Sequence, residues 1–336
     1  MNSPCRLMHQ KFWVTLFIIV AMLFASAASS GCRPGGQISR EGEDEALPSL
    51  PREIDPGERK EPQISVYIAE EDTVVTMPIE EYIAGVVAGE MEPTWPIEAL
   101  AAQAIIARTF TLQKIAEDGG VPHRNAHAST DIEEFQAYSA ADVTQRVKDA
   151  VKMTRGKVVC YKKQFIRAWF SAYAGPKTAR ADEGLNFEGG NPPYIHIVDS
   201  PGKDIIPLEE ANWSAGFPLE KIREVVRELT GEDPGYVENV DIKENGPSGR
   251  VKTFAVNGQE IPAPEMRLGL GSTEMRSTFI EKMYMDGGML QLSGTGFGHG
   301  VGMCQWGARA MAEDGKSPEE IINYFYRDIE IVSLWD

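Results

Sequence analysis

At 336 residues, the chain is long enough for one large domain or two domains of ordinary size. Hydrophobic residues make up 42% of it and charged residues 25%, which indicates a folded protein. The formal net charge of −17 argues against nucleic-acid binding and against a polyanion held by a broad basic surface. If the ligand is an anionic polymer, its recognition must therefore be local.

The four cysteines, at positions 5, 32, 160 and 304, include no CxxC pair, which excludes a disulfide scaffold and a zinc ribbon. Cys160 and Cys304 would be able to pair in an oxidising compartment. Two unpaired core cysteines are the simpler interpretation.

The N-terminus predicts export. Arg6 and Lys11 precede an apolar run at residues 12–28, about 17 residues long and near the lower limit for a membrane span. Three interpretations remain open: an uncleaved signal anchor, a signal peptide cut near residues 25–27, and a lipoprotein signal ending at Cys32. All three leave the positive flank inside and export the remainder.

We therefore predict that residues 1–34 form an N-terminal membrane anchor or signal segment. The rest of the chain is expected to be extracytoplasmic, held at the cell membrane by a single-pass anchor. Residues 35–62 are rich in Pro, Gly, Glu and Arg, and this composition predicts a disordered acidic linker.

Folded structure is expected from about Gln63, where ISVYIA and TVVTM alternate as a short pair of strands. Residues 77–116 then predict two helices joined by a tight corner. Pro78 suits the first helical turn, where its missing N–H would have no partner in any case. Pro93 ends that helix and Pro96 begins the second, which is apolar on nearly every side and is expected in the core.

Glu90 is the main catalytic candidate. At about 100° per residue, Ile79 and Val86 fall on the same side of the first helix as Glu90. The glutamates at positions 80, 81 and 92 are expected on the flank or the opposite face. An apolar setting at a helix C-terminus should raise the pKa of Glu90, and a general acid needs a proton near neutral pH. The alternative is that Glu90 only ends the helix and reaches water.

Arg108 lies in the second helix on the same side as Ala101 and Ile115. A guanidinium there needs a carboxylate or several carbonyl groups as partners. A structural ion pair is one interpretation, and a role in orienting Glu90 or a substrate group is the other.

Residues 119–141 predict a loop that contains His123 and His127. Two histidines four positions apart can bind zinc when they lie on a helix. Pro122 and its polar neighbours argue against a regular helix, so a solvated loop is the favoured interpretation.

After a helix expected at 141–154, two strand-like runs end in the turn at residues 174–177. Tyr173 and Lys177 lie at this turn, just beyond a strand, where scaffolds commonly display functional groups. An ordinary surface turn is the alternative.

The section from residue 294 onward is rich in glycine, but it fits neither a Walker A loop nor a Rossmann fingerprint. So many glycines indicate backbone packed closely against another group. His299 and Gln305 are the polar side chains that such a loop would present.

Together these patterns predict an α+β fold. We expect a main α/β lobe with a core helical pair, formed by about residues 63–190 and 286–336. Residues 191–285 combine an amphipathic helix with several strands, and they predict a smaller, β-rich lobe. The two lobes would form one catalytic domain, residues 63–336, with the active-site cleft between them.

Three stretches resemble the stage II sporulation protein D family: EEYIAGVVAGEMEPTWPIEALAAQAIIARTF, YAGPKTA and GTGFGHGVGMCQWGARAMAEDGKSPEEIINYFY. With the segments between them, they cover the chain from about residue 64 to its C-terminus. The N-terminal segment and linker are similar to the family's arrangement as well. The resemblance implies a membrane-anchored, extracytoplasmic peptidoglycan lytic transglycosylase, an enzyme of cell-wall degradation that acts during engulfment in sporulation.

The implied substrate is glycan stripped of its stem peptides, cleaved at MurNAc–GlcNAc bonds to give 1,6-anhydroMurNAc ends. The family's catalytic glutamate corresponds to Glu90. One carboxyl group suffices for this lyase, because the 6-hydroxyl of the muramic acid replaces water, whereas ordinary glycosidases use two. The implied partners are a membrane scaffold and an amidase/endopeptidase of the engulfment complex. No cofactor is implied.

The resemblance also implies substrate-binding or Glu90-supporting roles for polar residues around the cleft. Lys177 and Arg108 would pair locally with the lactyl carboxylate of denuded muramic acid. The full set of expected substrate-binding residues is Arg108, Gln136, Tyr173, Lys177, His299 and Gln305, in which Tyr173 is included for its place beside the turn.

Two positions depart from the family pattern. Glu92 stands where the family more often has proline, which lengthens the corner by one residue. Some relatives bind zinc near the loop before Gln136, but Glu134 and Phe135 occupy the corresponding cysteine neighbourhood here, so we expect no metal. Two other functions remain open: a non-catalytic activator of a cell-wall amidase, and a structural component of the engulfment complex.

Overall fold

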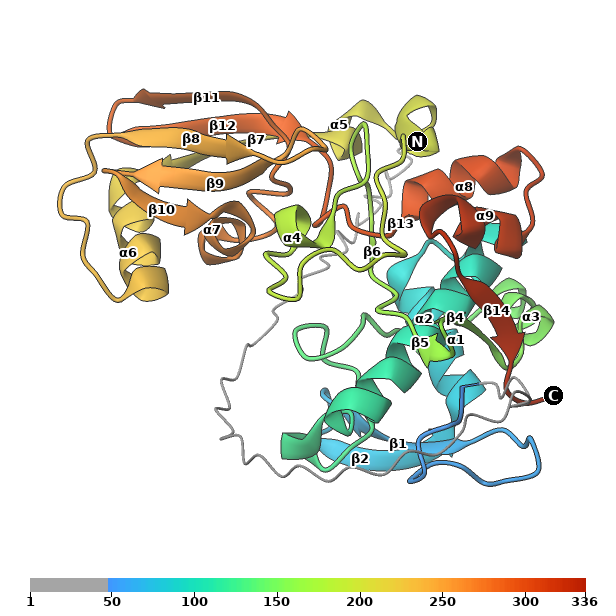
Figure 1. The fold of residues 1–336 in the computed structure, drawn as a ribbon. Coiled ribbons are helices and arrows are strands. Elements are labelled where there is room, and N and C mark those ends of the chain that lie inside the picture. Colours follow the sequence, from blue (N-terminus) through green and yellow to red (C-terminus); the bar gives the residue numbers. More distant parts are fainter. Residues whose placement is uncertain (1–47) are drawn as a thin grey trace, which may run out of the picture.

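The computed structural model describes residues 48–336, so the predicted anchor and the first part of the predicted linker lie outside the described residues. No helix within residues 48–336 is both long and apolar enough to cross a membrane. The fold is α+β, as predicted, and its buried apolar side chains form two clusters (Figure 1). The first core draws on residues 54–211 and 301–335, and the second core on residues 213–292.

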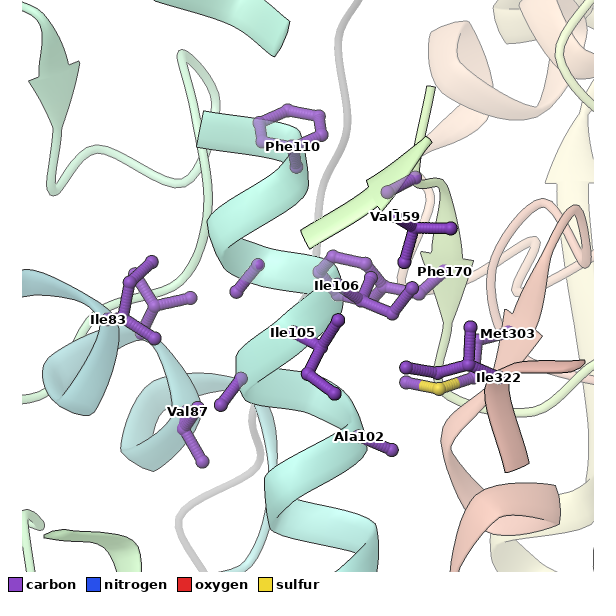
Figure 2. Packing of buried hydrophobic residues seen from close by; sticks show 14 of the residues in the cluster. Ile83, Val87, Ala102, Ile105, Ile106, Phe110, Val159, Phe170, Met303 and Ile322 are labelled. Carbon is purple, nitrogen blue, oxygen red and sulfur yellow. The ribbon is translucent and has the colours of Figure 1, made fainter. Parts of the chain in front are cut away.

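The first core is built around α2 (Ile97–Asp118), which is buried over most of its length. Gly119, with φ of 70°, ends this helix in the left-handed conformation that favours glycine. α1 (Ile79–Glu90) packs against α2, and Figure 2 shows Ile83 and Val87 of α1 beside α2. The other helices and 3-10 turns around this core are α3 (Gln145–Met153), α4 (Ala181–Gly184), α5 (Leu208–Ala211), α8 (Gln305–Glu313), α9 (Pro318–Phe325), η1 (Pro122–Arg124) and η2 (Pro201–Asp204).

Three small sheets surround these helices. β1 (Gln63–Ile68) lies between antiparallel β2 (Thr73–Pro78) and parallel β3 (Ala128–Ser129). β4 (Lys157–Tyr161) lies between β14 (Glu330–Ser333) and β5 (Gln164–Phe165), both antiparallel to it. β13 (Met303–Cys304) runs parallel to β6 (Phe170–Ser171), and this pairing brings the glycine-rich section onto the first core (Figure 2).

The second core lies between two antiparallel sheets and two helices (Figure 1). In one sheet, β12 (Met289–Thr295) is central between β11 (Ile280–Asp286) and β7 (Asn212–Pro218). In the other, β9 (Val251–Val256) is central between β8 (Val240–Asn245) and β10 (Gln259–Pro262). The helices are α6 (Leu219–Thr230) and α7 (Ala263–Leu270).

The chain passes between the two cores at later points than the sequence indicated. It enters the second core between Ala211 and Trp213, whereas the sequence predicted a boundary near residue 190. It returns to the first core between Leu292 and Val301, whereas the predicted boundary was near residue 285. Residues 191–211 remain with the first core, in which Ile195 is buried. Hydrophobic patterning shows that a segment is buried, but it does not show which partner covers it.

The described part of the predicted linker also differs from the expectation. Residues 48–62 follow a packed course in which Ile54 is only 5% exposed and joins the first core. Glu61 accepts the backbone N–H of Glu80 and forms an ion pair with Arg155 at 2.6 Å. A few apolar and paired side chains thus hold a segment whose average composition is typical of a disordered chain.

Candidate active site

Glu90 is the last residue of α1, and the chain at residues 136–138 runs directly against this end of the helix. Glycine at position 89 makes the approach possible, because a Cβ there would lie 2.6 Å from the backbone nitrogen of Tyr138. The backbone N–H of Ala137 can therefore donate a hydrogen bond to Oε1 of Glu90, at 2.8 Å.

Burial raises the pKa of Glu90 from 4.5 to about 7. The Ala137 N–H and the side chain of Gln305 lower it, but they do not outweigh the loss of hydration. Part of the residue still reaches solvent, whereas Oε2 is buried and has no partner of normal hydrogen-bond geometry among the described residues. A carboxyl group of this kind keeps its proton up to neutral pH and offers one oxygen for proton transfer.

Gln305 approaches Glu90 from the far end of the chain. Gly302 has φ of 74°, and a Cβ there would collide with the carbonyl oxygen of Trp169, so glycine is required for β13 to pair with β6. The thiol of Cys304 then caps α8 by accepting the N–H of Gly307 at 3.3 Å.

This local geometry fixes Gln305 as the first residue of α8. Its side chain lies close enough to lower the pKa of Glu90, and its Nε2 is a buried donor without a partner of normal geometry among the described residues. A buried amide donor and a buried carboxyl oxygen therefore lie in one neighbourhood, close enough for Gln305 to act on Glu90 but without normal hydrogen-bond geometry between them. Both can hydrogen-bond to a polar ligand there.

Two tryptophans that the sequence analysis did not single out connect these elements. Trp95 lies in the corner between α1 and α2, and Trp306 directly follows Gln305; their ring centroids are 4.9 Å apart. The guanidinium of Arg309 lies 5.2 and 4.9 Å from the two ring centroids. The rings are only 9% and 8% exposed, so they brace the corner against α8. The sequence offers one signal for each tryptophan: Trp95 lies between two prolines of the predicted corner, and Trp306 follows the candidate residue Gln305.

Arg108 forms a buried ion pair with Glu80. Its Nη2 lies 2.6 Å from Oε2 of Glu80, and its Nε donates to Oε1 at 3.1 Å. The guanidinium also donates to the carbonyl groups of Ala104 and Lys157, and Arg108 has no exposed surface. These contacts support the interpretation of Arg108 as half of a structural ion pair. Arg108 would have to separate from Glu80 before it could contact a substrate. Glu80 was expected on the flank or the opposite face from the apolar stripe, but it is buried, and Arg108 compensates its charge.

Gln136 is fully buried, and its Nε2 donates to the hydroxyl group of Thr111 at 3.1 Å. It directly precedes Ala137, the residue whose N–H bonds to Glu90. Its contact therefore fixes the backbone donor in place, a supporting role rather than an exposed substrate contact.

Tyr173 and Lys177 lie at a turn that is held in place by hydrogen bonds from Arg250. Arg250, fully buried just before β9, donates to the carbonyl oxygens of Ala174 and Lys177. Tyr173 is 4% exposed, and burial raises its pKa to about 12. The side chain of Lys177 is exposed, 3.9 Å from a carboxylate oxygen of Asp199. Within residues 48–336, no hydrogen bond or ion pair joins this turn to the carboxyl group of Glu90.

His299 is a buried, neutral imidazole. Burial and the charges of Arg267 and Arg250 lower its pKa to about 3. Its Nδ1 accepts the N–H of Val301 at 3.0 Å, which assigns the ring proton to Nε2. His299 therefore stabilises the backbone of the glycine-rich section by accepting the N–H of Val301.

His123 and His127 have separate partners. His123 Nε2 lies 3.1 Å from Oε1 of Glu134, whereas Nδ1 of His127 accepts the N–H of Ser65 at 3.1 Å. Within residues 48–336, no group of three or more His, Cys, Asp or Glu side chains is arranged to hold a metal ion. The two cysteines of the described chain, at positions 160 and 304, are both unpaired, so the simpler interpretation is confirmed.

Comparison with known proteins gives two family matches. A family described as "Stage II sporulation protein" matches residues 67–161, which include Glu90, Arg108 and Gln136. A domain of unknown function matches residues 208–302, close to the limits of the second core.

Similar proteins are found in two Bacillus species. The protein named Stage II sporulation protein D of Bacillus subtilis (strain 168) is 31% identical over 290 residues, covering 80% of this chain and 78% of its own. The protein of the same name from Bacillus amyloliquefaciens is also 31% identical, with the same coverage. The amidase enhancer of Bacillus subtilis (strain 168) is 26% identical, covering 75% of this chain and 40% of its own.

Proposed function

Because the chain belongs to the stage II sporulation protein D family, whose members are involved in sporulation, we propose that it is a peptidoglycan lytic transglycosylase. Its substrate is the peptide-denuded glycan strand, and its products carry 1,6-anhydroMurNAc ends. The observation that carries this proposal is the buried carboxyl group of Glu90, with its pKa of about 7 and one oxygen that no described residue contacts with normal hydrogen-bond geometry.

The chemistry follows from this single carboxyl group. Protonated Glu90 donates its proton to the glycosidic oxygen as the bond from MurNAc C1 to that oxygen breaks, which leaves the departing GlcNAc with a hydroxyl group. The ionised carboxylate then accepts the proton of the MurNAc 6-hydroxyl as its oxygen bonds to C1. Glu90 ends the cycle protonated, and no water is consumed, so a second carboxylate is unnecessary.

The surroundings of Glu90 support this cycle. A pKa near 7 keeps much of the acid form at neutral pH and still allows the carboxylate to act as a base. The N–H of Ala137 holds Oε1, which leaves Oε2 to exchange the proton, and Gln305 offers an amide donor to the sugar. We place the glycan-binding cleft beside Glu90 and Gln305, between the first and second cores.

The proposal extends to location and partners. We infer that residues 1–34 anchor the protein in the cell membrane, or direct its export, and that the enzyme acts on the extracytoplasmic side. During engulfment it would work with a membrane scaffold and with an amidase/endopeptidase that removes stem peptides and so creates its substrate.

Activation of a cell-wall amidase is the second candidate function. Its support is the 26% identity to the amidase enhancer of Bacillus subtilis (strain 168). A pure activator has no use for a buried carboxyl group that is costly to ionise, which favours the enzyme.

Mass spectrometry of products from peptide-free glycan tests the proposal. We expect anhydromuramic ends with the wild-type protein and with Glu92→Gln, which changes an exposed glutamate two positions away, but none with Glu90→Gln. Reducing ends would instead make water the nucleophile and require a second carboxylate. No cleavage by the wild type, together with stimulation of an amidase by Glu90→Gln, would favour the activator.

A further inference from the structure

Arg250 connects the second core to the first. It lies in the turn between β8 and β9 and has no exposed surface, and burial lowers its pKa to about 10, so it stays a cation at neutral pH. Its guanidinium donates to the carbonyl oxygens of Ala174 and Lys177, in the part of the chain that belongs to the first core. In the opposite direction, the buried carboxylate of Glu183 accepts the backbone N–H of Ser248 at 3.3 Å. The turn between β8 and β9 is therefore fastened to the first core from both sides.

A guanidinium in this position is costly to bury. The charge of Glu183 acts on Arg250, but the two form no direct ion pair, and neither does Arg250 with any other residue of the described chain. Gly300 leaves room for the guanidinium, because a Cβ there would lie 2.2 Å from its Nη2. An apolar side chain would fill the same space at a lower cost in folding free energy. What it would not supply is the pair of hydrogen bonds to the 174–177 turn.

Ala174 extends this contact toward the active site. Its carbonyl oxygen accepts from Arg250, and its N–H donates to Sγ of Cys304 at 3.3 Å. Cys304 is the N-cap of α8, and the next residue is Gln305, whose side chain acts on the carboxyl group of Glu90. One residue and one thiol group thus separate the guanidinium from the start of α8.

A neighbouring contact fixes the same arrangement. The N–H of Trp306 donates to the carbonyl oxygen of Ala172 at 3.1 Å, and the ring of Trp306 packs on Trp95 in the corner that follows Glu90. The start of α8 is therefore held between residues 172–174 and this corner. A shift of residues 172–174 would move Gln305 relative to Glu90, and a displacement of about 1 Å can lower a catalysed rate about a hundredfold.

We propose that Arg250 is a positioning residue of the active site, through which the second core holds Gln305 in place against Glu90. Arg250 fixes the 174–177 turn, the turn fixes Cys304, and Cys304 sets the first residue of α8. Residues 208–302, which match a domain of unknown function, thereby orient the active site from outside it. The proposal rests on the proposed function only for the reaction that this site performs.

The pKa of Glu90, measured by NMR of ¹³C-labelled glutamate side chains, tests this positioning without substrate. Glu90→Gln identifies the signal by its loss. Because Gln305 lowers the pKa of Glu90, Arg250→Ala should raise it by as much as Gln305→Ala does. Arg250→Lys keeps the charge and can serve one carbonyl group, so it should give a smaller rise. The hydroxyl group of Tyr82 also responds to Glu90, but burial raises its pKa well above 10 and keeps it protonated throughout this titration.

Two further variants separate positioning from a general loss of stability. Arg250→Ala combined with Gln305→Ala should show the same Glu90 pKa as Gln305→Ala alone, because Arg250 acts through Gln305. Arg267→Ala is the matched control, because Arg267 is also buried but donates within the second core, to the carbonyl groups of Ser272 and Arg276. It should lower stability and leave the pKa of Glu90 unchanged.

Three results would overturn the proposal: an unchanged or lower pKa of Glu90 in Arg250→Ala, an equal rise in Arg267→Ala, or a further rise in the double variant. If Arg250→Ala does not fold, Arg250→Lys decides by the same criteria.

Cleavage of peptide-free glycan separates this proposal from the previous one. Arg250→Ala should lower kcat/KM about ten- to a hundredfold and move the alkaline limb of its profile to higher pH. If the wild type produces no anhydro ends but Arg250→Ala still raises the pKa of Glu90, the positioning stands and the lyase proposal fails. If the wild type cleaves and Arg250→Ala leaves the pKa and the pH profile unchanged, only the positioning fails.

Discussion

Replacing Glu90 with glutamine should stabilise the folded protein at alkaline pH. Burial raises the pKa of this carboxyl group from 4.5 to about 7. The stability contributed by the protonated form is therefore fully present below pH 4.5 and is lost as the pH rises through 7. The shift of about 2.5 units corresponds to about 3.4 kcal/mol, of which about 2.5 kcal/mol falls between about pH 5 and pH 8.

Glutamine is neutral at every pH, and its Oε1 can still accept the N–H of Ala137. Urea denaturation at about pH 5 and pH 8 should therefore show that the free energy of unfolding of Glu90→Gln, relative to wild type, rises by about 2.5 kcal/mol across this interval. Glu228→Gln, on the exposed face of α6, provides the control and should follow the wild type. If Glu90→Gln differs from wild type by the same amount at both pH values, burial does not raise the pKa of Glu90 and the reasoning fails.

Two further changes test the surroundings of Glu90. Arg108→Ala leaves the carboxylate of Glu80 buried without its cation, so thermal or urea unfolding should show a loss of about 3–5 kcal/mol. Adding Glu80→Ala should recover part of that loss, and a single variant as stable as wild type would contradict the ion-pair role. Gln305→Ala removes a group that lowers the pKa of Glu90, so the alkaline limb of the kcat/KM profile should move to higher pH; an unchanged limb would exclude this contact.

The helical corner was predictable because its signals are local. Pro78 and Pro96 directly precede the first residues of α1 and α2, and the period of the apolar residues was enough to predict that Glu90 is buried. The helical wheel failed for Glu80 because it assumes one buried face, whereas α1 is buried on nearly all sides. The contacts of Glu90 with Ala137 and Gln305 depend on distant segments that meet only in the folded chain, and no periodicity in the sequence encodes them.

Glu80 and Glu90 lie near the two ends of α1, and their surroundings differ in charge and in hydrogen-bond donors. The Glu80 carboxylate is paired with Arg108 and also accepts the backbone N–H of Gly156 and the indole N–H of Trp335, each at 3.0 Å. The positive N-terminal end of the helix dipole is at its side. Glu90 lies at the negative end, has one backbone donor at 2.8 Å, and has no ion-pair partner among the described residues. Such surroundings stabilise a fixed charge at Glu80 and a transferable proton at Glu90, which is the physical reason for assigning the acid to Glu90 alone.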